Sequence, residues 1–155
     1  LIFFTDYAEI RDGNIVESNK LLRIKRIMLF ILRPKSMWGS RFARRRVLSM
    51  GSPICCPSIT YYKPNLMEPV FLNGFRSNED WEAEERISQL DGEFIFCNKI
   101  LTYHRIHEDS ETSKIIHDSK RSEEDYAMYR KFWPSGIARI LTKLYSSSEK
   151  SNNIK

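Results

Sequence analysis

Cysteine is scarce in this sequence, and the three cysteines that occur are poorly placed for a disulfide framework. Cys55 and Cys56 are adjacent and Cys97 is left over, so reduced thiols are the expected state. The sequence also has no C-x-x-C pair and no histidine at zinc-finger spacing. A structural zinc site is therefore unsupported.

Long apolar runs are missing as well. No stretch reaches the roughly 18–20 apolar residues that a membrane-spanning helix needs. The first residues also lack the basic, apolar and small-residue regions of a signal peptide. With 41% hydrophobic and 29% charged residues in a chain of 155, the composition is typical of a globular domain with its own core. These absences predict a cytoplasmic protein.

Acidic residues are absent from one segment, Lys20–Arg46, which holds ten basic residues. Its local charge of +10 exceeds the +5 of the whole chain. Such a segment can attract an anionic membrane surface, a sugar nucleotide or a nucleic acid, and a solvated basic helix face is the alternative. Nucleic acid is not expected, because no helix-turn-helix, zinc-finger or RNP-type signature accompanies the charge. The segment leaves open a non-catalytic binding module, attached peripherally to a membrane.

Strand and helix signals alternate along the chain. The expected elements are a strand from Leu1 to about Tyr7, a turn at Asp12–Asn14, a helix with an apolar stripe of Leu21, Ile24, Met28 and Ile31 that ends at Arg33, a helix over Arg41–Leu48, strand structure within Pro53–Tyr62, a helix from Asp80 to about Leu90, a strand from Glu93 to Tyr103, and helices after Ser122 and Pro134. This order predicts an α/β domain over residues 1–145, with a mixed sheet and C-terminal helices. Residues 146–155 are predicted to form a flexible tail.

The Glu79-Asp80 pair stands at a predicted helix start. Ser77, with Asp80 three residues later, is close to a capping box, and acids in the first turn are favoured by the helix dipole. A carboxylate with a reference pKa of about 3.9 is also ionised at neutral pH, as a general base must be. Capping and catalysis are compatible, and the residues alone leave both open.

Histidines and adjacent cysteines also suggest chemistry. His104 and His107 follow a predicted strand, but alone they give only a weak metal-binding signal. Cys55 and Cys56 are interpreted as packing residues, because nothing near them in sequence would depress their pKa.

Four segments resemble the second half of family 2 glycosyltransferases, which have the GT-A fold. These segments are Gly51–Ser58, Asn78–Ala83, Thr102–His107 and Lys131–Asn152, and they cover most of residues 50–152. The resemblance implies transfer of a sugar, with inversion, from a nucleotide-sugar donor to a hydroxyl of a saccharide or lipid-linked acceptor. The Gln-x-x-Arg-Trp element of processive synthases is absent, which favours the transfer of a single sugar.

The resemblance also implies roles for individual residues. Asp80 would be the catalytic base with Glu79 beside it, Ser58, Trp81 and Arg105 would bind substrate, and His107, or alternatively His104, would complete a Mg²⁺ or Mn²⁺ site. Family members commonly have tryptophan where Glu84 stands, so the site should differ here. Because the chain begins inside a strand without Met, we expect the donor-binding half, with its Asp-x-Asp metal element, to precede it. The metal should bind only with that half, and residues 1–155 alone should be inactive.

Overall fold

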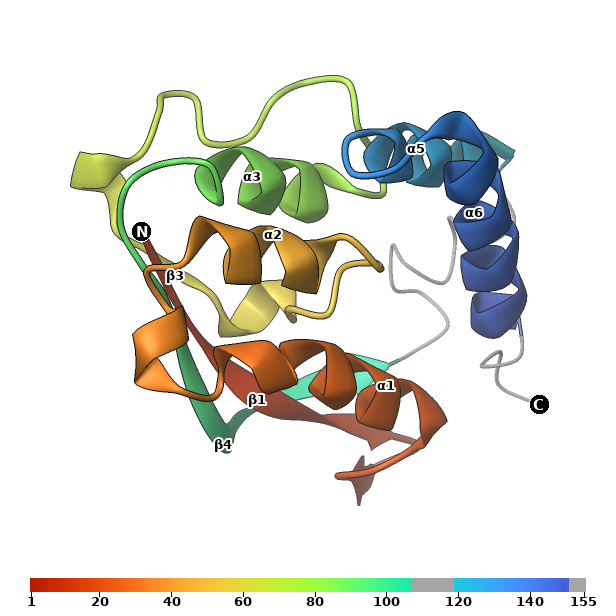
Figure 1. Ribbon diagram of the computed structural model, residues 1–155. Helices are drawn as coiled ribbons and strands as arrows, with labels where there is room; N and C mark the ends of the chain where they lie inside the picture. The colour runs from red at the N-terminus through yellow and green to blue at the C-terminus, as the bar shows by residue number, and fades with distance from the viewer. Residues whose placement is uncertain (107–118, 151–155) are drawn as a thin grey trace.

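The computed structural model describes residues 1–106 and 119–150 (Figure 1). In chain order the elements are β1 (Ile2–Arg11), β2 (Asn14–Val16), α1 (Lys20–Leu29), η1 (Phe30–Leu32), η2 (Lys35–Met37), α2 (Arg41–Leu48), η3 (Cys56–Ser58), β3 (Thr60–Tyr61), η4 (Lys63–Asn65), α3 (Glu79–Ile87), β4 (Phe94–Ile106), α5 (Ser119–Arg130) and α6 (Ser135–Lys150); those labelled η are 3₁₀ turns. Among these residues no helix is both long and apolar enough to cross a bilayer.

The sheet is built around two long strands, β1 and β4. They run parallel, from Ile2 beside Phe94 to Arg11 beside Ile106. Two short strands, β2 and β3, pair antiparallel with β1 near its two ends. A parallel pair needs a long crossover connection, and here that connection carries α1, α2 and α3. The predicted α/β architecture with a mixed sheet and C-terminal helices is confirmed at this level.

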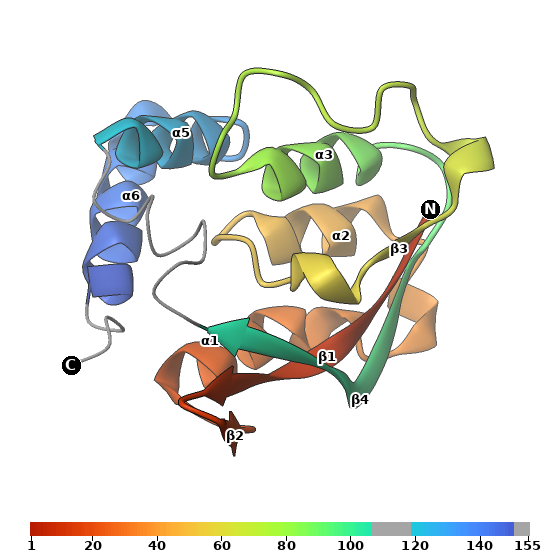
Figure 2. The ribbon, with the colours of Figure 1, turned by 180° about the vertical axis from the view of Figure 1, so that it is seen from behind.

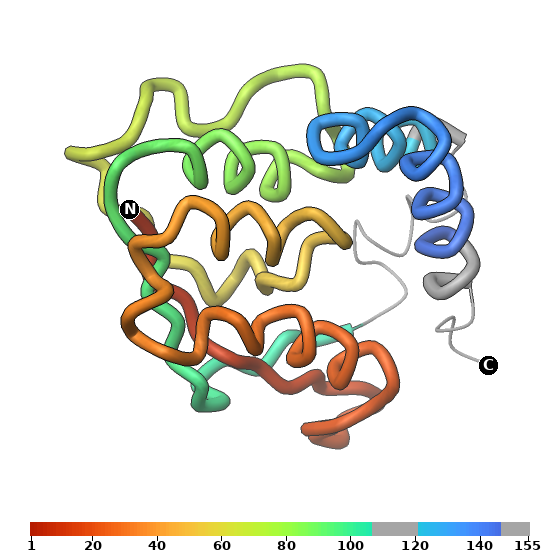
Figure 3. The backbone as a smooth tube through the Cα atoms, in the orientation of Figure 1, coloured from red at the N-terminus to blue at the C-terminus, as the bar shows by residue number. Residues whose placement is uncertain are grey.

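The helices α1, α2 and α3 lie side by side in one layer (Figure 1), and the view from behind shows β1 and β4 crossing in front of α1 (Figure 2). Between α2 and α3 the chain returns toward the sheet through η3, which contacts both β1 and β4. The tube in Figure 3 follows this return before the chain reaches α3. The helices α5 and α6 pack together at the end of the molecule where α3 begins.

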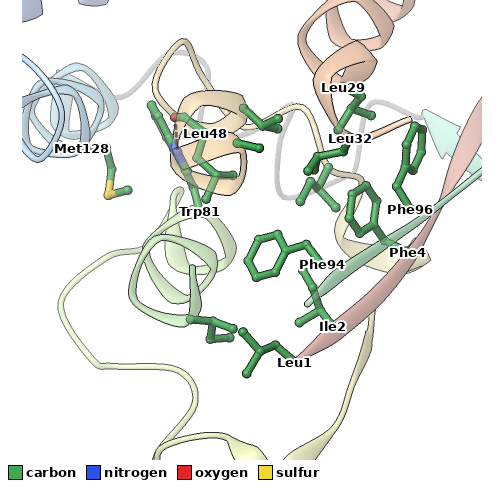
Figure 4. Close-up of a cluster of buried hydrophobic side chains, with 14 of the residues drawn as sticks. Leu1, Ile2, Phe4, Leu29, Leu32, Leu48, Trp81, Phe94, Phe96 and Met128 are labelled. Atoms are coloured by element: carbon green, nitrogen blue, oxygen red, sulfur yellow. Dashed lines mark hydrogen bonds between the residues drawn. The ribbon is translucent and has the colours of Figure 1, made fainter. Parts of the chain in front are cut away.

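The main core lies between the sheet and the helices (Figure 4). Phe4 of β1 stacks on Phe96 of β4 with 5.0 Å between ring centroids. The Trp81 side chain is fully buried, and its Nε1 donates a hydrogen bond to the Leu48 carbonyl at 3.0 Å, drawn as the dashed line. Tyr129 of α5 meets the Trp81 ring edge-on at 5.2 Å. The C-terminal helices therefore contribute to the same core.

Two strand predictions were wrong in length. The strand β1 continues to Arg11 rather than ending near Tyr7, and it reaches the expected turn, where Gly13 adopts a φ of 78°. The stretch from 53 to 62 contains only the two-residue strand β3, because Pro57 lies within the 3₁₀ turn η3.

The inner face of α1 also differs from the predicted one. Leu22 and Leu29 are buried, whereas Ile24 of the predicted stripe is exposed. Lys25 and Arg26 lie on the inward side between the two leucines, and Arg26 Nε donates to Asp6 Oδ2 at 2.8 Å. The apolar periodicity predicted the wrong inner face because Tyr7 and Asp6 of β1 interact with Lys25 and Arg26 and allow these cations to face the sheet.

Candidate functional site

The start of α3 is held by α5 and not by the predicted capping box. Asn78 is the N-cap residue, but its side chain makes no cap hydrogen bond. Its Nδ2 instead donates to Asp125 Oδ1 at 2.9 Å. The backbone N–H of Ser77 donates to the Glu124 carboxylate at 2.8 Å. The capping-box prediction for Ser77 and Asp80 was therefore wrong, and α5 fixes the position of the acidic pair.

Asp80 is half-buried in the first turn of α3, whereas Glu79 beside it is exposed. Asp80 Oδ1 accepts a hydrogen bond from the Trp81 N–H at 2.8 Å. Burial raises the pKa of Asp80 above its ordinary value, although the Trp81 N–H and the Lys25 ammonium oppose the rise. The expected reference value was thus too low. A raised pKa makes Asp80 a stronger base than an exposed aspartate.

Asp80 belongs to a group of titratable side chains that we call the Asp80 cluster. Its members are Tyr7 of β1, Lys25 of α1, Cys55 and Cys56 at η3, Tyr61 of β3, and Asp80 and Glu84 of α3. The Lys25 ammonium lies 5.4 Å from the centroid of the Tyr7 ring. Burial acts to lower the pKa of Lys25, but Tyr7, Cys55 and Asp80 outweigh burial and leave that pKa raised. Lys25 therefore stays protonated at neutral pH, and its positive charge acts on the Asp80 carboxylate.

Glu84 is the most unusual member of the cluster. Its side chain is fully buried one turn after Asp80, and within the described part of the chain neither carboxylate oxygen has a hydrogen-bond partner. Burial and the Asp80 charge raise its pKa well above 4.5, and Lys25 only partly offsets them. A buried carboxyl group without a partner is more stable in its protonated, neutral form than in its charged form. Glu84 is accordingly kept in its neutral form.

The two other buried glutamates of α3 are paired. Glu82 accepts from Arg86 at 2.9 Å and from Lys131 at 3.0 Å. Glu85 accepts from Arg45 at 2.6 Å and from Lys131 at 3.2 Å. Burial acts to raise the pKa of Glu82, but its two cationic partners outweigh burial and lower it. All three glutamates are buried, but among the described residues only Glu82 and Glu85 have cationic partners that stabilise the charged form.

The adjacent cysteines are weakly acidic. Burial raises the pKa of the Cys55 thiol to about 12, and partial desolvation of the Cys56 thiol, in a residue that is otherwise exposed, raises its pKa to about 11. The negative charge of Asp80 also raises the pKa of Cys56. Because the thiolate is the reactive form, neither residue is suited to be a nucleophile at neutral pH. Their interpretation as packing residues holds for buried Cys55, whereas Cys56 is exposed.

Alkylation of Cys56 by iodoacetamide near pH 8 should be about ten-fold slower than that of free cysteine. Asp80→Asn should accelerate the reaction, because it removes a negative charge that raises the Cys56 pKa. The control Glu79→Gln changes an exposed neighbour and should leave the rate unchanged. Peptide mass spectrometry over time gives the rates. Equal rates in the Asp80→Asn and parent proteins would show that these two residues do not interact.

Three residues were expected to bind substrate. Ser58 is buried, and its Oγ donates to the Cys55 carbonyl at 2.7 Å within η3. Trp81 has no exposed surface, and its N–H already donates to the Leu48 carbonyl, so its side chain is not accessible to a substrate. Arg105 is exposed on β4, beside Ile10 of β1. Of the three, Trp81 follows Asp80 directly in sequence, and Ser58 lies two residues after Cys56.

The expected metal ligand, His107, lies outside the described residues. The alternative, His104, is half-buried on β4 with its ring centroid 6.3 Å from that of Tyr7. Within residues 1–106 and 119–150, no three His, Cys, Asp or Glu side chains are arranged to hold a metal ion. The expected Mg²⁺ or Mn²⁺ site stays a prediction, since its proposed ligand His107 is not among these residues.

Some members of the cluster could not be singled out from the sequence. Glu84 follows Asp80 by four residues, the spacing that places two side chains on one helix face, so a signal for this pair exists. Lys25 is one of ten basic residues in its segment, and nothing local indicates that it turns inward. Tyr61 is equally unmarked.

No protein-family model matches this chain, and neither the curated proteins nor the solved structures contain a significant match. Its function therefore has to be argued from the Asp80 cluster and from the fold that assembles it.

Proposed function

We propose that this chain carries the acceptor side of an inverting glycosyltransferase of GT-A type, with Asp80 as the general base. The observation that carries the proposal is the setting of the Asp80 carboxylate, which is half-buried at a helix start and within electrostatic range of the Lys25 ammonium. Burial strengthens the base, and the nearby cation favours the ionised form that can accept a proton.

The position of Asp80 in the fold supports this role. The helix α3 begins at the end of the molecule toward which the arrowheads of β1 and β4 point (Figure 2). In open α/β sheets, ligands bind beyond the carboxyl ends of the parallel strands. An acceptor bound at this end would reach the first turn of α3, where Asp80 lies.

In the proposed reaction, Asp80 removes the proton from the acceptor hydroxyl while that oxygen attacks the anomeric carbon of the donor. The bond between this carbon and the diphosphate oxygen breaks on the opposite face, and the nucleoside diphosphate leaves with the electron pair. The proton on Asp80 then passes to water, and Lys25 stabilises the regenerated carboxylate. Attack opposite the leaving group inverts the anomeric configuration.

Donor binding is assigned to residues outside this chain, because the 155 residues contain no Asp-x-Asp sequence. The proposal therefore divides the reaction between two parts, a donor site elsewhere and the acceptor side described above. The divalent metal implied by the resemblance stays a prediction tied to that donor site.

The test is a screen of nucleotide sugars for release of nucleoside diphosphate, with saccharide acceptors and Mg²⁺ or Mn²⁺ in the buffer. It compares the 155-residue chain with the protein made from the complete open reading frame that contains it. We expect turnover by the complete protein and none by residues 1–155 alone. A complete protein that is inert with every donor, or equal turnover after Asp80→Ala, would refute the proposal.

A further inference from the structure

The outward side of α1 carries large apolar side chains. Ile27 is 73% exposed and Phe30, in the turn that follows, is 64% exposed, with Ile24 beside them at 42%. This turn packs against α2, where Phe42 is 74% exposed. Single exposed apolar residues are ordinary, but a group of them on neighbouring helices marks an interaction surface.

Basic side chains surround these apolar residues. Lys20, Arg23, Arg33 and Lys35 are all exposed, and the Arg33 guanidinium lies 5.2 Å from the centroid of the Phe30 ring. No acidic residue occurs between 20 and 46 to offset them. We call this surface the α1 face. It consists of Lys20, Arg23, Ile24, Ile27, Phe30, Arg33, Lys35 and Phe42.

Other basic residues of the same segment stabilise the fold instead. Arg26 pairs with Asp6, and Arg45 pairs with Glu85. Arg44 is fully buried and donates to two backbone carbonyls that follow α3. The segment thus divides into cations that hold the helices in place and cations that remain on the α1 face.

We propose that the α1 face docks on the surface of an anionic lipid bilayer. Ile27 and Phe30 enter the boundary between headgroups and acyl chains, and the surrounding cations meet the lipid phosphates. A bilayer surface offers both an apolar layer and negative charge, so it matches both properties of this face. A second copy of the chain would bring two positive surfaces together, and a nucleic acid would place Ile27 and Phe30 against a charged backbone.

Co-sedimentation with vesicles tests this proposal. Phosphatidylcholine vesicles containing about one-third phosphatidylserine should bind the chain, and vesicles of phosphatidylcholine alone should bind it at least about ten-fold less. Binding should weaken steeply as salt is raised, because the cations are exposed. Absence of binding to the anionic vesicles would overturn the proposal.

Two double variants separate apolar from ionic contributions. Ile27→Ser with Phe30→Ser, and Arg23→Gln with Arg33→Gln, should each weaken binding about ten-fold or more, and the second should also reduce the salt dependence. The matched control is Leu101→Ser with Arg105→Gln, which changes two exposed residues on β4 and should leave binding unchanged. Circular dichroism checks that each variant is folded.

Three results would contradict membrane docking even if the chain sediments with vesicles. The first is unchanged binding by the Ile27→Ser, Phe30→Ser protein. The second is a concentration-dependent dimer that this variant abolishes, which would assign the face to a second copy. The third is equally tight, salt-dependent binding to duplex DNA, which would show that charge alone is recognised.

Discussion

Asp80→Asn should lower the turnover of the complete protein by about 10²-fold or more, while the protein remains folded. Asparagine keeps the shape of the side chain and can still accept the Trp81 N–H through its amide oxygen. Stability should therefore change by less than about 1 kcal/mol, since the side-chain shape and the hydrogen bond from the Trp81 N–H are both kept. The variant loses the negative charge of Asp80 and with it the ability to accept a proton.

Steady-state kinetics separate the two roles of Asp80. Turnover should fall while KM for the donor stays nearly constant, because Asp80 acts on the acceptor hydroxyl. Glu79→Gln is the matched control, since it removes a neighbouring carboxylate that is exposed, and its effect should be much smaller. Full activity in Asp80→Asn, or a loss that merely follows unfolding, would show that Asp80 only supports the helix start.

Glu84→Gln should stabilise the protein at neutral pH. Burial raises the pKa of this carboxyl group well above 4.5 in the folded protein, so the folded state keeps a proton that the unfolded state releases above that pH. Stability therefore falls as pH rises from the unfolded pKa to the folded pKa. Glutamine has no proton to release and avoids this loss.

The pH dependence identifies the cause. Near pH 4 both proteins should be about equally stable, because Glu84 is protonated in both states. Above about 4.5 the difference should grow by up to ~1.4 kcal/mol per pH unit, and it should level off above the folded pKa. Denaturant unfolding at a series of pH values gives the difference directly. A difference that does not vary with pH would mean that Glu84 has the same pKa in the folded and unfolded states, and so is not held neutral by burial.

Glu85→Gln is the matched control on the same helix. Glu85 is equally buried but pairs with Arg45 and Lys131, which are each about one-third exposed. Its replacement should destabilise the protein by about 1–2 kcal/mol at neutral pH, the opposite sign to Glu84→Gln. Two buried glutamates one residue apart thus differ because only one has cationic partners.

The neutral state of Glu84 bears on the resemblance described above. Under the proposed function, Glu84 stands where glycosyltransferases of the resembled family commonly have tryptophan, and it holds its proton, so both side chains are uncharged. Under the proposed function, the charge near Asp80 is preserved although the size of the side chain is not.

Local signals predicted several elements well. The helix α2 has the expected bounds, Arg41–Leu48, because Ser40 before it accepts the Ala43 N–H as an N-cap. The helix α3 ends three residues earlier than expected, at Ile87. Helix bounds of this kind depend on residues close together in sequence, so the sequence alone can predict them.

The candidate site depends on distant residues, and the sequence predicted only part of it. The Lys25 side chain can be buried with its charge because Tyr7 and Asp80 stabilise that charge, and both lie far from Lys25 in the chain. The start of α3 is held by Glu124 and Asp125, 47 residues away. Periodicity cannot anticipate such partners, and so Lys25 looked like part of a solvated basic helix.

The anomeric configuration of the product is the most direct test of the central claim, that Asp80 acts as the base of a single displacement. Proton NMR during turnover of an α-linked nucleotide sugar by the complete protein distinguishes the two anomers of the first product formed. The account predicts a β-linked product, and it predicts that Asp80→Asn forms that product at least ~10²-fold more slowly. An α-linked product would contradict it, because retention requires a mechanism in which Asp80 does not serve as the base of one direct attack.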